Sequence, residues 1–227
     1  AEELWRQSEA STTALIRRHA RGGEMILDVG VGLGRLLAPF PELRRYGMDI
    51  SWGYLEVARA AGIAVCYARI EDMPYHDGVF DAAVCTDVLE HVLDLNRCCA
   101  RLLAAVKPGG VVIVRVPYRE ELGGYLAATC PYRYVHLRAF DESALRLLFE
   151  RIFGCTVLET QPAGYMPYAD RLRTPAALPR CGAALARILS GVRAVRAGWY
   201  DRLVRAFYLP MEINAVVRTP GPPPDAA

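Results

Sequence analysis

Short apolar runs alternate along this chain with segments in which apolar residues recur every three or four positions. The apolar runs predict β-strands at 25–29, 45–49, 63–68, 81–85, 111–116, 156–158 and 212–218. The segments with helical spacing predict helices at 2–20, from 33 onward, and at 54–61, 95–106 and 145–153. This alternation of strands and helices is typical of an α/β fold with a doubly wound sheet.

A glycine-rich turn follows the first predicted strand. The strand ends near Asp28, and Gly30, Gly32 and Gly34 come directly afterwards. Because glycine has no Cβ, the backbone can turn tightly and a ligand can approach it closely, while the helix expected from 33 offers unpaired N–H groups. About 20 residues later, a second strand ends in Asp49, whose carboxylate can accept hydrogen bonds from both hydroxyls of a ribose. These residues predict a site for a nucleotide-like cofactor.

The spacing of this turn narrows the choice of cofactor. The dinucleotide pattern requires its third glycine at position 35, where this chain has Arg35. The carboxylate of Asp28 would repel a pyrophosphate, but it can hold an ammonium group directly or through water. S-adenosylmethionine carries an ammonium group and no phosphate, so it is the predicted cofactor. The alternative is an ordinary strand-to-helix connection with no ligand.

Five further blocks of sequence follow the glycine-rich turn in a fixed order. Together the six blocks resemble the class I S-adenosylmethionine-dependent methyltransferases, in particular the small-molecule subgroup that includes the ubiquinone and menaquinone biosynthesis enzymes. The likeness covers roughly residues 20–160. The blocks are Leu27–Gly34, Gly47–Ser51, Glu71–Tyr75, Phe80–Val84, Asp87–Val92 and Leu102–Gly110.

The resemblance implies a Rossmann-like, doubly wound, seven-stranded sheet whose last strand is antiparallel. It also implies that the glycine-rich turn passes under the methionine and ribose parts of S-adenosylmethionine. Asp28 and Asp49 would then bind the ammonium group and the ribose. Ile50 would pack against the adenine, and Asp87 would lie near the methionine end.

One block departs from the pattern of this family. Where the family usually has an aspartate that bonds the adenine amino group, this chain has Arg69, whose guanidinium offers donors only. Glu71 or a backbone carbonyl would then accept from the amino group, and the backbone N–H of Ile70 would meet an adenine ring nitrogen. Arg69 is equally consistent with a surface position.

The acceptor side of the reaction has three candidate catalytic residues. Methyl transfer is an in-line displacement at the sulfonium carbon, so the protein's main task is to hold the acceptor atom against the methyl group. A weakly acidic acceptor also needs a general base, for which His91, His136 and Tyr118 are the candidates. The alternatives are that His91 bonds to backbone at the start of a helix, and that His136 caps the helix beginning near Asp141.

Asp87, Glu90 and His91 form an acid-x-x-acid-His array, which we expect at the start of a helix. A similar array in the ubiquinone-type O-methyltransferases, with glutamate first, looks like a divalent-metal site, and hard oxygen ligands suit magnesium. Many relatives with related sequences here need no metal, so we expect a site without metal and leave binding at this array open. The seven cysteines lack the spacing of a zinc site and indicate reduced thiols.

Length and charge indicate one methyltransferase domain over 1–218, followed by a proline-rich tail over 219–227 that we expect to be disordered. No apolar run reaches the roughly 20 residues that span a bilayer, and no secretion signal is apparent, so we expect a cytoplasmic protein. A formal net charge of +2 is too small to indicate a nucleic-acid partner. The oligomeric state stays open.

An arginine-rich helical insertion is predicted at about 169–208, before the last strand. Residues 183–207 have the spacing of one amphipathic helix, or of two helices broken near Gly198, and Arg196 falls within the apolar arc. The insertion would pack on the domain with Arg196 reaching solvent, form a lid over an acidic substrate, or rest on a membrane surface. The apolar arc consists of Leu185, Ile188, Leu189, Val192, Val195, Trp199, Leu203 and Phe207.

The sequence therefore predicts an S-adenosylmethionine-dependent methyltransferase that acts on a small molecule. O-methylation in the biosynthesis of secondary metabolites, quinones or glycan precursors is the favoured reaction. The alternatives are a protein or nucleic-acid methyltransferase and a catalytically silent scaffold with the methyltransferase fold.

Overall fold

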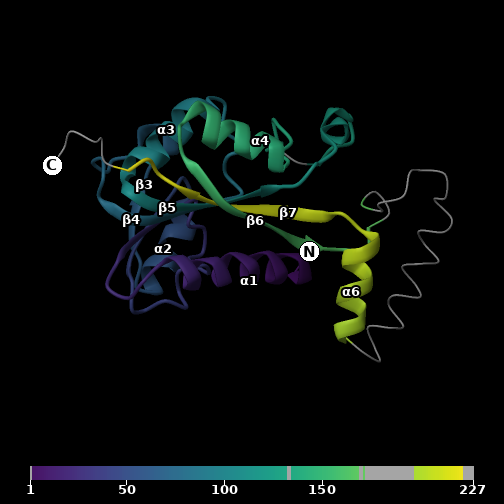
Figure 1. Ribbon diagram of the computed structural model, residues 1–227, viewed down its shortest axis with the longest axis horizontal. Helices are drawn as coiled ribbons and strands as arrows, with labels where there is room; N and C mark the ends of the chain where they lie inside the picture. The colour runs from purple at the N-terminus through teal and green to yellow at the C-terminus, as the bar shows by residue number, and fades with distance from the viewer. Residues whose placement is uncertain (1, 132–133, 169–170, 172–196, 222–227) are drawn as a thin grey trace.

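The computed structural model describes residues 2–131, 134–168, 171 and 197–221. Its centre is a seven-stranded sheet with the strand order β3-β2-β1-β4-β5-β7-β6 (Figure 1). Strands β1 to β5 run parallel to one another, whereas β7 is antiparallel to both β5 and β6, which confirms the predicted sheet. The strands are β1 (Met25–Val29), β2 (Arg44–Asp49), β3 (Ala64–Tyr67), β4 (Phe80–Thr86), β5 (Val106–Pro117), β6 (Thr156–Tyr165) and β7 (Pro210–Arg218).

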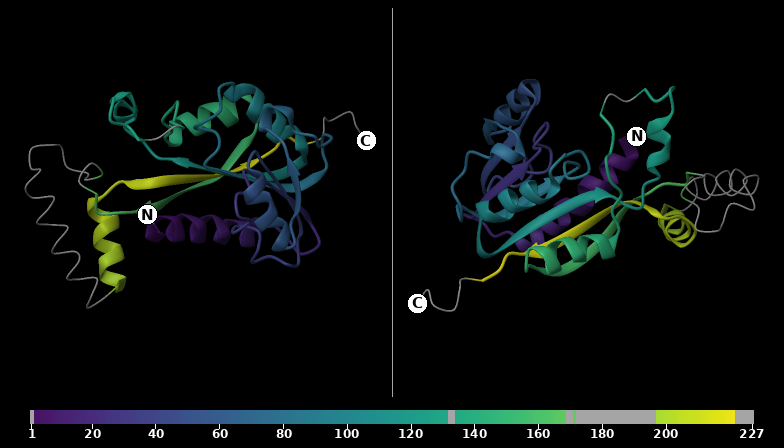
Figure 2. Two further views of the ribbon diagram at one scale, coloured as in Figure 1. Left: turned by 180° about the vertical axis from the view of Figure 1, so that it is seen from behind. Right: turned by 90° about the horizontal axis from the view of Figure 1, so that it is seen from above.

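Helices cover both faces of this sheet. Helices α3 and α4 lie on one face, and α1 and α2 lie on the other (Figures 1 and 2). Two short 3-10 helices occupy Ile70–Asp72 and Leu122–Leu126, and a π-helical segment, Leu147–Ile152, continues α4. The helices are α1 (Glu2–His19), α2 (Trp52–Ala60), α3 (Leu95–Ala105), α4 (Glu142–Arg146) and α6 (Ala197–Phe207).

The alternating faces of the strands separate two hydrophobic layers. In β1, Leu27 and Val29 belong to the layer beneath α3 and α4, whereas Ile26 belongs to the layer beneath α1 and α2. Asp28 therefore points to the same side of the sheet as Ile26, between apolar neighbours. The parallel strands also bring the segments after β1, β2 and β4 to one edge of the sheet, where ligands bind in folds of this kind.

The helix expected from residue 33 does not form, and this prediction is wrong. The chain between β1 and β2 consists of turns. Gly34 has a φ of +76°, in the left-handed region, so a right-handed helix cannot begin there, and Pro39 and Pro41 follow too soon to leave room for one. No helix N-terminus therefore follows the glycine-rich turn.

Two later elements also differ from the prediction. The helix expected at 145–153 is a short α-helix that widens into the π-helical segment, and β6 is longer than expected because it pairs with most of β7. The tail is ordered at its start, since the hydroxyl of Thr219 donates to the carbonyl of Lys107 at 2.8 Å. The amide of Gly109 likewise donates to the carbonyl of Pro220 at 3.0 Å. Residues 222–227 lie outside the described part.

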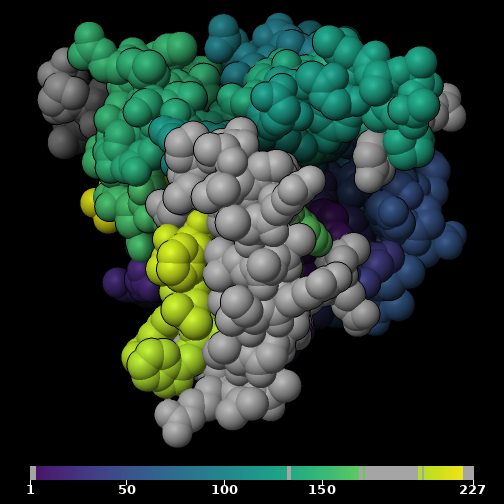
Figure 3. Space-filling view, turned by 90° about the vertical axis from the view of Figure 1, so that its right-hand side faces the viewer, coloured from purple at the N-terminus to yellow at the C-terminus, as the bar shows by residue number. Residues whose placement is uncertain are grey.

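Of the arginine-rich insertion, the structure describes Arg171 and the residues from α6 onward, so Arg196 and the predicted helix before α6 lie outside the described residues. The buried residues of α6 and the position after it are Tyr200, Val204 and Tyr208. Each stands one residue after a member of the predicted apolar arc. Figure 3 shows α6 and the segment that follows β5 on the same face of the molecule. Among the described residues, no helix is both long enough and apolar enough to cross a membrane.

Candidate active site

The glycine-rich turn after β1 is held in its shape by close packing. Gly30 has a φ of +80°, and a Cβ there would lie 2.5 Å from Cγ2 of Val88. A Cβ on Gly34 would lie 2.7 Å from Cδ1 of Ile63. At Gly32, with a φ of +50°, a Cβ would meet only the carbonyl oxygen of Gly30, at 4.0 Å. Glycine is therefore required at the outer two positions because neighbouring side chains leave no room for a Cβ. At the middle position the absence of a Cβ leaves the surface of the turn accessible.

Asp49 at the end of β2 is fixed by backbone amides. Its two carboxylate oxygens accept hydrogen bonds from the amides of Gly32 and Ser51, both at 2.9 Å. The first of these bonds ties the glycine-rich turn directly to the residue predicted to bind a ribose. The next residue, Ile50, is 62% exposed although it is apolar, which leaves its side chain available to a ligand.

The region predicted to hold the adenine contains a pair that sequence reasoning missed. The rings of Trp52 and Tyr67 stack with their centroids 4.9 Å apart and their planes 6° apart, and both residues are exposed. Arg69 is exposed and pairs with the carboxylate of Glu71 at 3.2 Å, so the surface alternative for Arg69 describes its position. The side chain of Ile70 is buried in the core, where it begins the 3-10 helix.

Asp87 follows β4 with a φ of +57°, which is rare for a residue other than glycine. Its carboxylate forms an ion pair with Arg115 of β5, whose side chain is 2% exposed. Arg115 also donates to the hydroxyl of Thr12 at 3.2 Å, and that hydroxyl donates to the side-chain oxygen of Asn214 at 2.8 Å. This network was not predictable from the sequence, because Arg115 stands in an otherwise apolar strand and its partners are distant along the chain.

Buried carboxylates outnumber buried cations around this network. Burial raises the pKa of Asp28 to about 7, and its Oδ1 atom has no hydrogen-bond partner among the described residues. Burial also raises the pKa of Glu90 to about 7 and that of Glu212 to about 8, and the charge of Asp87 adds to both increases. Such a site favours a ligand that carries positive charge, because the ligand would offset the cost of ionising these groups.

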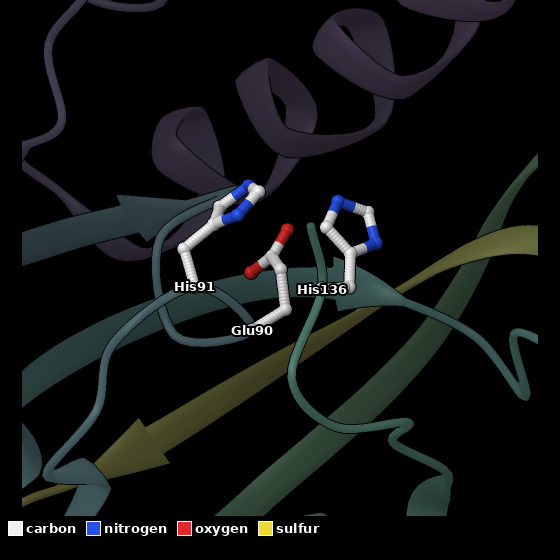
Figure 4. A group of neighbouring side chains, drawn as sticks. All are labelled: Glu90, His91 and His136. Atoms are coloured by element: carbon white, nitrogen blue, oxygen red, sulfur yellow. The ribbon is translucent and has the colours of Figure 1, made fainter. Parts of the chain in front are cut away.

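Glu90, His91 and His136 form a cluster beside Asp87 (Figure 4). One potential ligand atom from each residue lies within 4.8 Å of the others. The Nδ1 atom of His91 lies 3.2 Å from the carbonyl oxygen of Val135, and the two imidazole rings meet edge to face with centroids 4.6 Å apart. The structure thus brings together two of the three residues predicted to be catalytic.

A carboxylate that sequence reasoning missed orients one of these histidines. Nδ1 of His136 pairs with Oε2 of Glu120, and Oε1 of Glu120 accepts a hydrogen bond from the Tyr125 hydroxyl at 2.9 Å. His136 therefore does not cap α4; the side chain of Asp141 does so by accepting from the amide of Ala144 at 2.9 Å. The sequence around Glu120 offers no periodic signal, because Glu120 lies outside the helices and strands and its partner His136 is 16 residues away.

One further expectation about this region is wrong, and another stays untested. The acid-x-x-acid-His array does not start a helix: it lies in a turn, and α3 begins only at Leu95 with Asp94 as its N-cap. The third catalytic candidate, Tyr118, packs at the end of β5 against the hydrophobic layer beneath α3 and α4. Its role stays a prediction.

The sheet order, the glycine-rich turn and the fixed aspartate after β2 together define a class I S-adenosylmethionine-dependent methyltransferase domain. Residues 27–114 match a family model described as a methyltransferase domain. S-adenosylmethionine is the cofactor of the class.

Named relatives agree on the class and differ in substrate. The chain is 35% identical over 102 residues to a tRNA (carboxymethyluridine(34)-5-O)-methyltransferase of Arabidopsis thaliana, covering 44% of this chain and 25% of the relative. It is 37% identical over 134 residues to a ubiquinone biosynthesis O-methyltransferase of Chromobacterium violaceum, covering 53% of this chain and 56% of the relative. The chain thus spans between a quarter and about half of the length of these curated relatives.

A solved structure extends the likeness to the whole fold. It is a complex between the Haloferax volcanii Trm112 methyltransferase activator and a methyltransferase of unassigned function. The match has a TM-score of 0.67 at 19% identity and covers 98% of this chain and 92% of that chain. At this identity the likeness shows the fold alone.

Proposed function

We propose that this chain transfers the methyl group of S-adenosylmethionine to an oxygen atom of a small molecule. One observation carries the proposal: Asp28, directly before the glycine-rich turn, is buried with an oxygen that has no hydrogen-bond partner among the described residues, and Asp49 is bonded to the amide of Gly32 within that turn. A carboxylate at each position suits the ammonium group at one end of the cofactor and the ribose at its centre.

The remaining cofactor contacts extend this placement. The glycine-rich turn of Gly30, Gly32 and Gly34 would run beneath the cofactor. Asp87 would face the methionine end, where its pairing with Arg115 holds the carboxylate in one orientation. Ile50 would pack against the adenine next to the exposed Trp52–Tyr67 pair. The amide of Ile70 would meet the ring, while Glu71 is already paired with Arg69 and would reach the adenine only if that pair opened.

His91 and His136 would activate the acceptor. In the reaction the acceptor oxygen forms a bond to the methyl carbon, the bond from that carbon to sulfur breaks, and S-adenosylhomocysteine leaves with the bonding electron pair. The acceptor hydroxyl must also lose its proton. Glu120 holds one ring nitrogen of His136, so the other is available on the side of Glu90 and His91.

The first experiment is calorimetric titration with S-adenosylmethionine and S-adenosylhomocysteine. We expect micromolar binding that is lost in an Asp49→Ala variant, because the variant removes both the ribose contact and the bond to the Gly32 amide. Turnover of a panel of phenols, catechols and hydroxy acids, followed by mass spectrometry, would then identify the acceptor. An absence of binding to the wild-type chain would instead support the silent scaffold.

The Arabidopsis relative favours one further candidate, a modified uridine of tRNA as acceptor. Mass spectrometry after incubation with unmodified and modified tRNA distinguishes a tRNA acceptor from a small-molecule acceptor. Methylation of RNA with no turnover of any small molecule in the panel would replace the small-molecule proposal.

A further inference from the structure

We propose that Glu90, His91 and His136 bind a divalent transition-metal ion of the zinc or iron(II) type. The three side chains come from the turn after β4 and from the segment after β5, and Figure 4 shows the carboxylate of Glu90 between the two imidazole rings. The ligand set differs from the array visible in the sequence, because His136 takes part and Asp87 does not.

Glu90 supplies the first argument. Glu90 is 0% exposed, and neither of its carboxylate oxygens has a hydrogen-bond partner among the described residues. A buried carboxylate without a partner is costly, and native proteins pair such groups or use them to coordinate metals. The two histidines are the side chains that share its cluster, and neutral imidazole is an acceptor only at its unprotonated nitrogen.

The two histidines are already oriented as metal ligands are. Nδ1 of His91 lies 3.2 Å from the carbonyl oxygen of Val135, and Nδ1 of His136 pairs with the carboxylate of Glu120. Both partners accept hydrogen bonds, so each Nδ1 carries the proton and each Nε2 presents its lone pair. A backbone carbonyl or carboxylate behind the imidazole is the usual support of a metal-bound histidine.

The distances allow an ion after a small adjustment. Ligand atoms around a tetrahedral zinc ion lie about 3.4 Å apart, since each stands about 2.1 Å from the metal. The candidate atoms lie within 4.8 Å of one another, so the side chains would close by roughly 1 Å on binding. The surplus of buried carboxylates around the cluster favours the entry of a cation.

The ligand chemistry selects the class of metal. Asp87 is held by Arg115 and is not available, so the cluster offers two imidazole nitrogens and one carboxylate. Imidazole suits zinc, iron and related ions, whereas magnesium and calcium prefer oxygen ligands. Three protein ligands leave further positions open, where an acceptor oxygen could bind and lose its proton more easily. That role for the acceptor rests on the proposed function, but binding of the ion does not.

The experiment measures metal binding without cofactor or acceptor. The full chain is stripped with a chelator, dialysed and titrated with cobalt(II), whose visible absorption reports nitrogen and oxygen coordination, and zinc is then added as a competitor. We expect one equivalent of cobalt to bind and zinc to displace it. His91→Ala, His136→Ala and Glu90→Gln should each weaken binding at least 100-fold, and Glu120→Gln should weaken it about 10- to 100-fold.

A matched control is available on the first helix. His19 also pairs with a glutamate, since its Nε2 lies 2.8 Å from Oε1 of Glu159, but this pair lies outside the cluster. His19→Ala should leave cobalt binding unchanged. Binding of S-adenosylmethionine by every variant would show that each is folded.

Two outcomes would overturn the metal site. One is an absence of cobalt or zinc binding by a wild-type chain that still binds S-adenosylmethionine, which leaves the proposed function intact and assigns the histidines to proton transfer. The other is cobalt binding that the cluster variants leave unchanged. Failure of the wild-type chain to bind S-adenosylmethionine would instead count against the proposed function.

Discussion

Protonation of Asp28 should control the affinity for S-adenosylmethionine near neutral pH. Burial raises the pKa of this carboxyl group to about 7, while the charge of Arg115 lowers it and the charges of Asp49 and Asp87 raise it further. Only the ionised carboxylate attracts the ammonium group of the cofactor. With a pKa of about 7, about one tenth of the free protein is ionised at pH 6 and about nine tenths at pH 8. The dissociation constant should therefore fall about tenfold across this range.

An Asp28→Asn variant isolates this effect. The amide has nearly the same shape but carries no charge, so at pH 8 the variant should bind about 10- to 100-fold more weakly, as expected for a lost charge-assisted hydrogen bond. The amino group of the cofactor titrates in the same pH region, but it does so equally with both proteins. The difference between the two affinity profiles therefore belongs to Asp28.

Calorimetry in buffers with different ionisation enthalpies measures the protons exchanged on binding. At pH 7 the wild-type chain should release about half a proton more than the Asp28→Asn variant, because binding converts the half-protonated carboxyl group to carboxylate. Equal proton release by the two proteins, or parallel affinity profiles between about pH 6 and 8, would refute the placement of the ammonium group at Asp28.

Four further substitutions test the site. Gly30→Ala should destabilise the fold by about 1–3 kcal/mol, since its Cβ would lie 2.5 Å from a methyl carbon of Val88 in the turn after β4. Gly32→Ala, whose Cβ would meet only a backbone oxygen at 4.0 Å, should cost about 1 kcal/mol and chiefly weaken cofactor binding. Thermal unfolding measures the first effect and calorimetry the second. Arg115→Met should cost about 3–5 kcal/mol in denaturant unfolding, because it leaves Asp87 unpaired. Unchanged stability would contradict that role. Trp52→Ala should weaken cofactor binding with little change in melting temperature, because the ring is exposed.

The raised pKa of Asp28 should also make the stability of the fold depend on pH. Its pKa in the folded chain lies above its ordinary value, so the folded state binds more protons than the unfolded state does. Its contribution to stability is fully present below about pH 4 and is lost as the pH rises through about 7. Asp28→Asn should therefore melt at a higher temperature than the wild-type chain at pH 8, and the advantage should shrink toward pH 4.

The parts of the fold that were predictable from the sequence depend on local patterns. Strand β1, the glycine-rich turn and Asp49 follow from apolar periodicity and from residues adjacent in sequence. The missing helix after the turn shows the limit of such patterns: apolar spacing from 33 looked helical, but the left-handed Gly34 and Pro39 outweigh it.

The pairings that organise the site were not predictable, because they join residues far apart in the chain. Arg115 on β5 meets Asp87 directly after the neighbouring strand β4, and Glu120 meets His136, which is 16 residues away. Neither pair leaves a periodic signal. The positions of His91 and His136 were singled out from their residue types, but their closeness to each other and to Glu90 came only from the fold.

The family model covers only part of the candidate site. The family model matches residues 27–114, which contain the glycine-rich turn, Asp49, Asp87 and the first two residues of the Glu90–His91–His136 cluster. Glu120 and His136 lie beyond the matched region. The family model therefore covers the proposed cofactor contacts, whereas two residues that we place on the acceptor side lie outside it. Two relatives are named for different reactions, one as a tRNA (carboxymethyluridine(34)-5-O)-methyltransferase and the other as a ubiquinone biosynthesis O-methyltransferase. Under the proposed function, the acceptor of this chain is therefore to be sought through the chemistry of Glu90, His91 and His136.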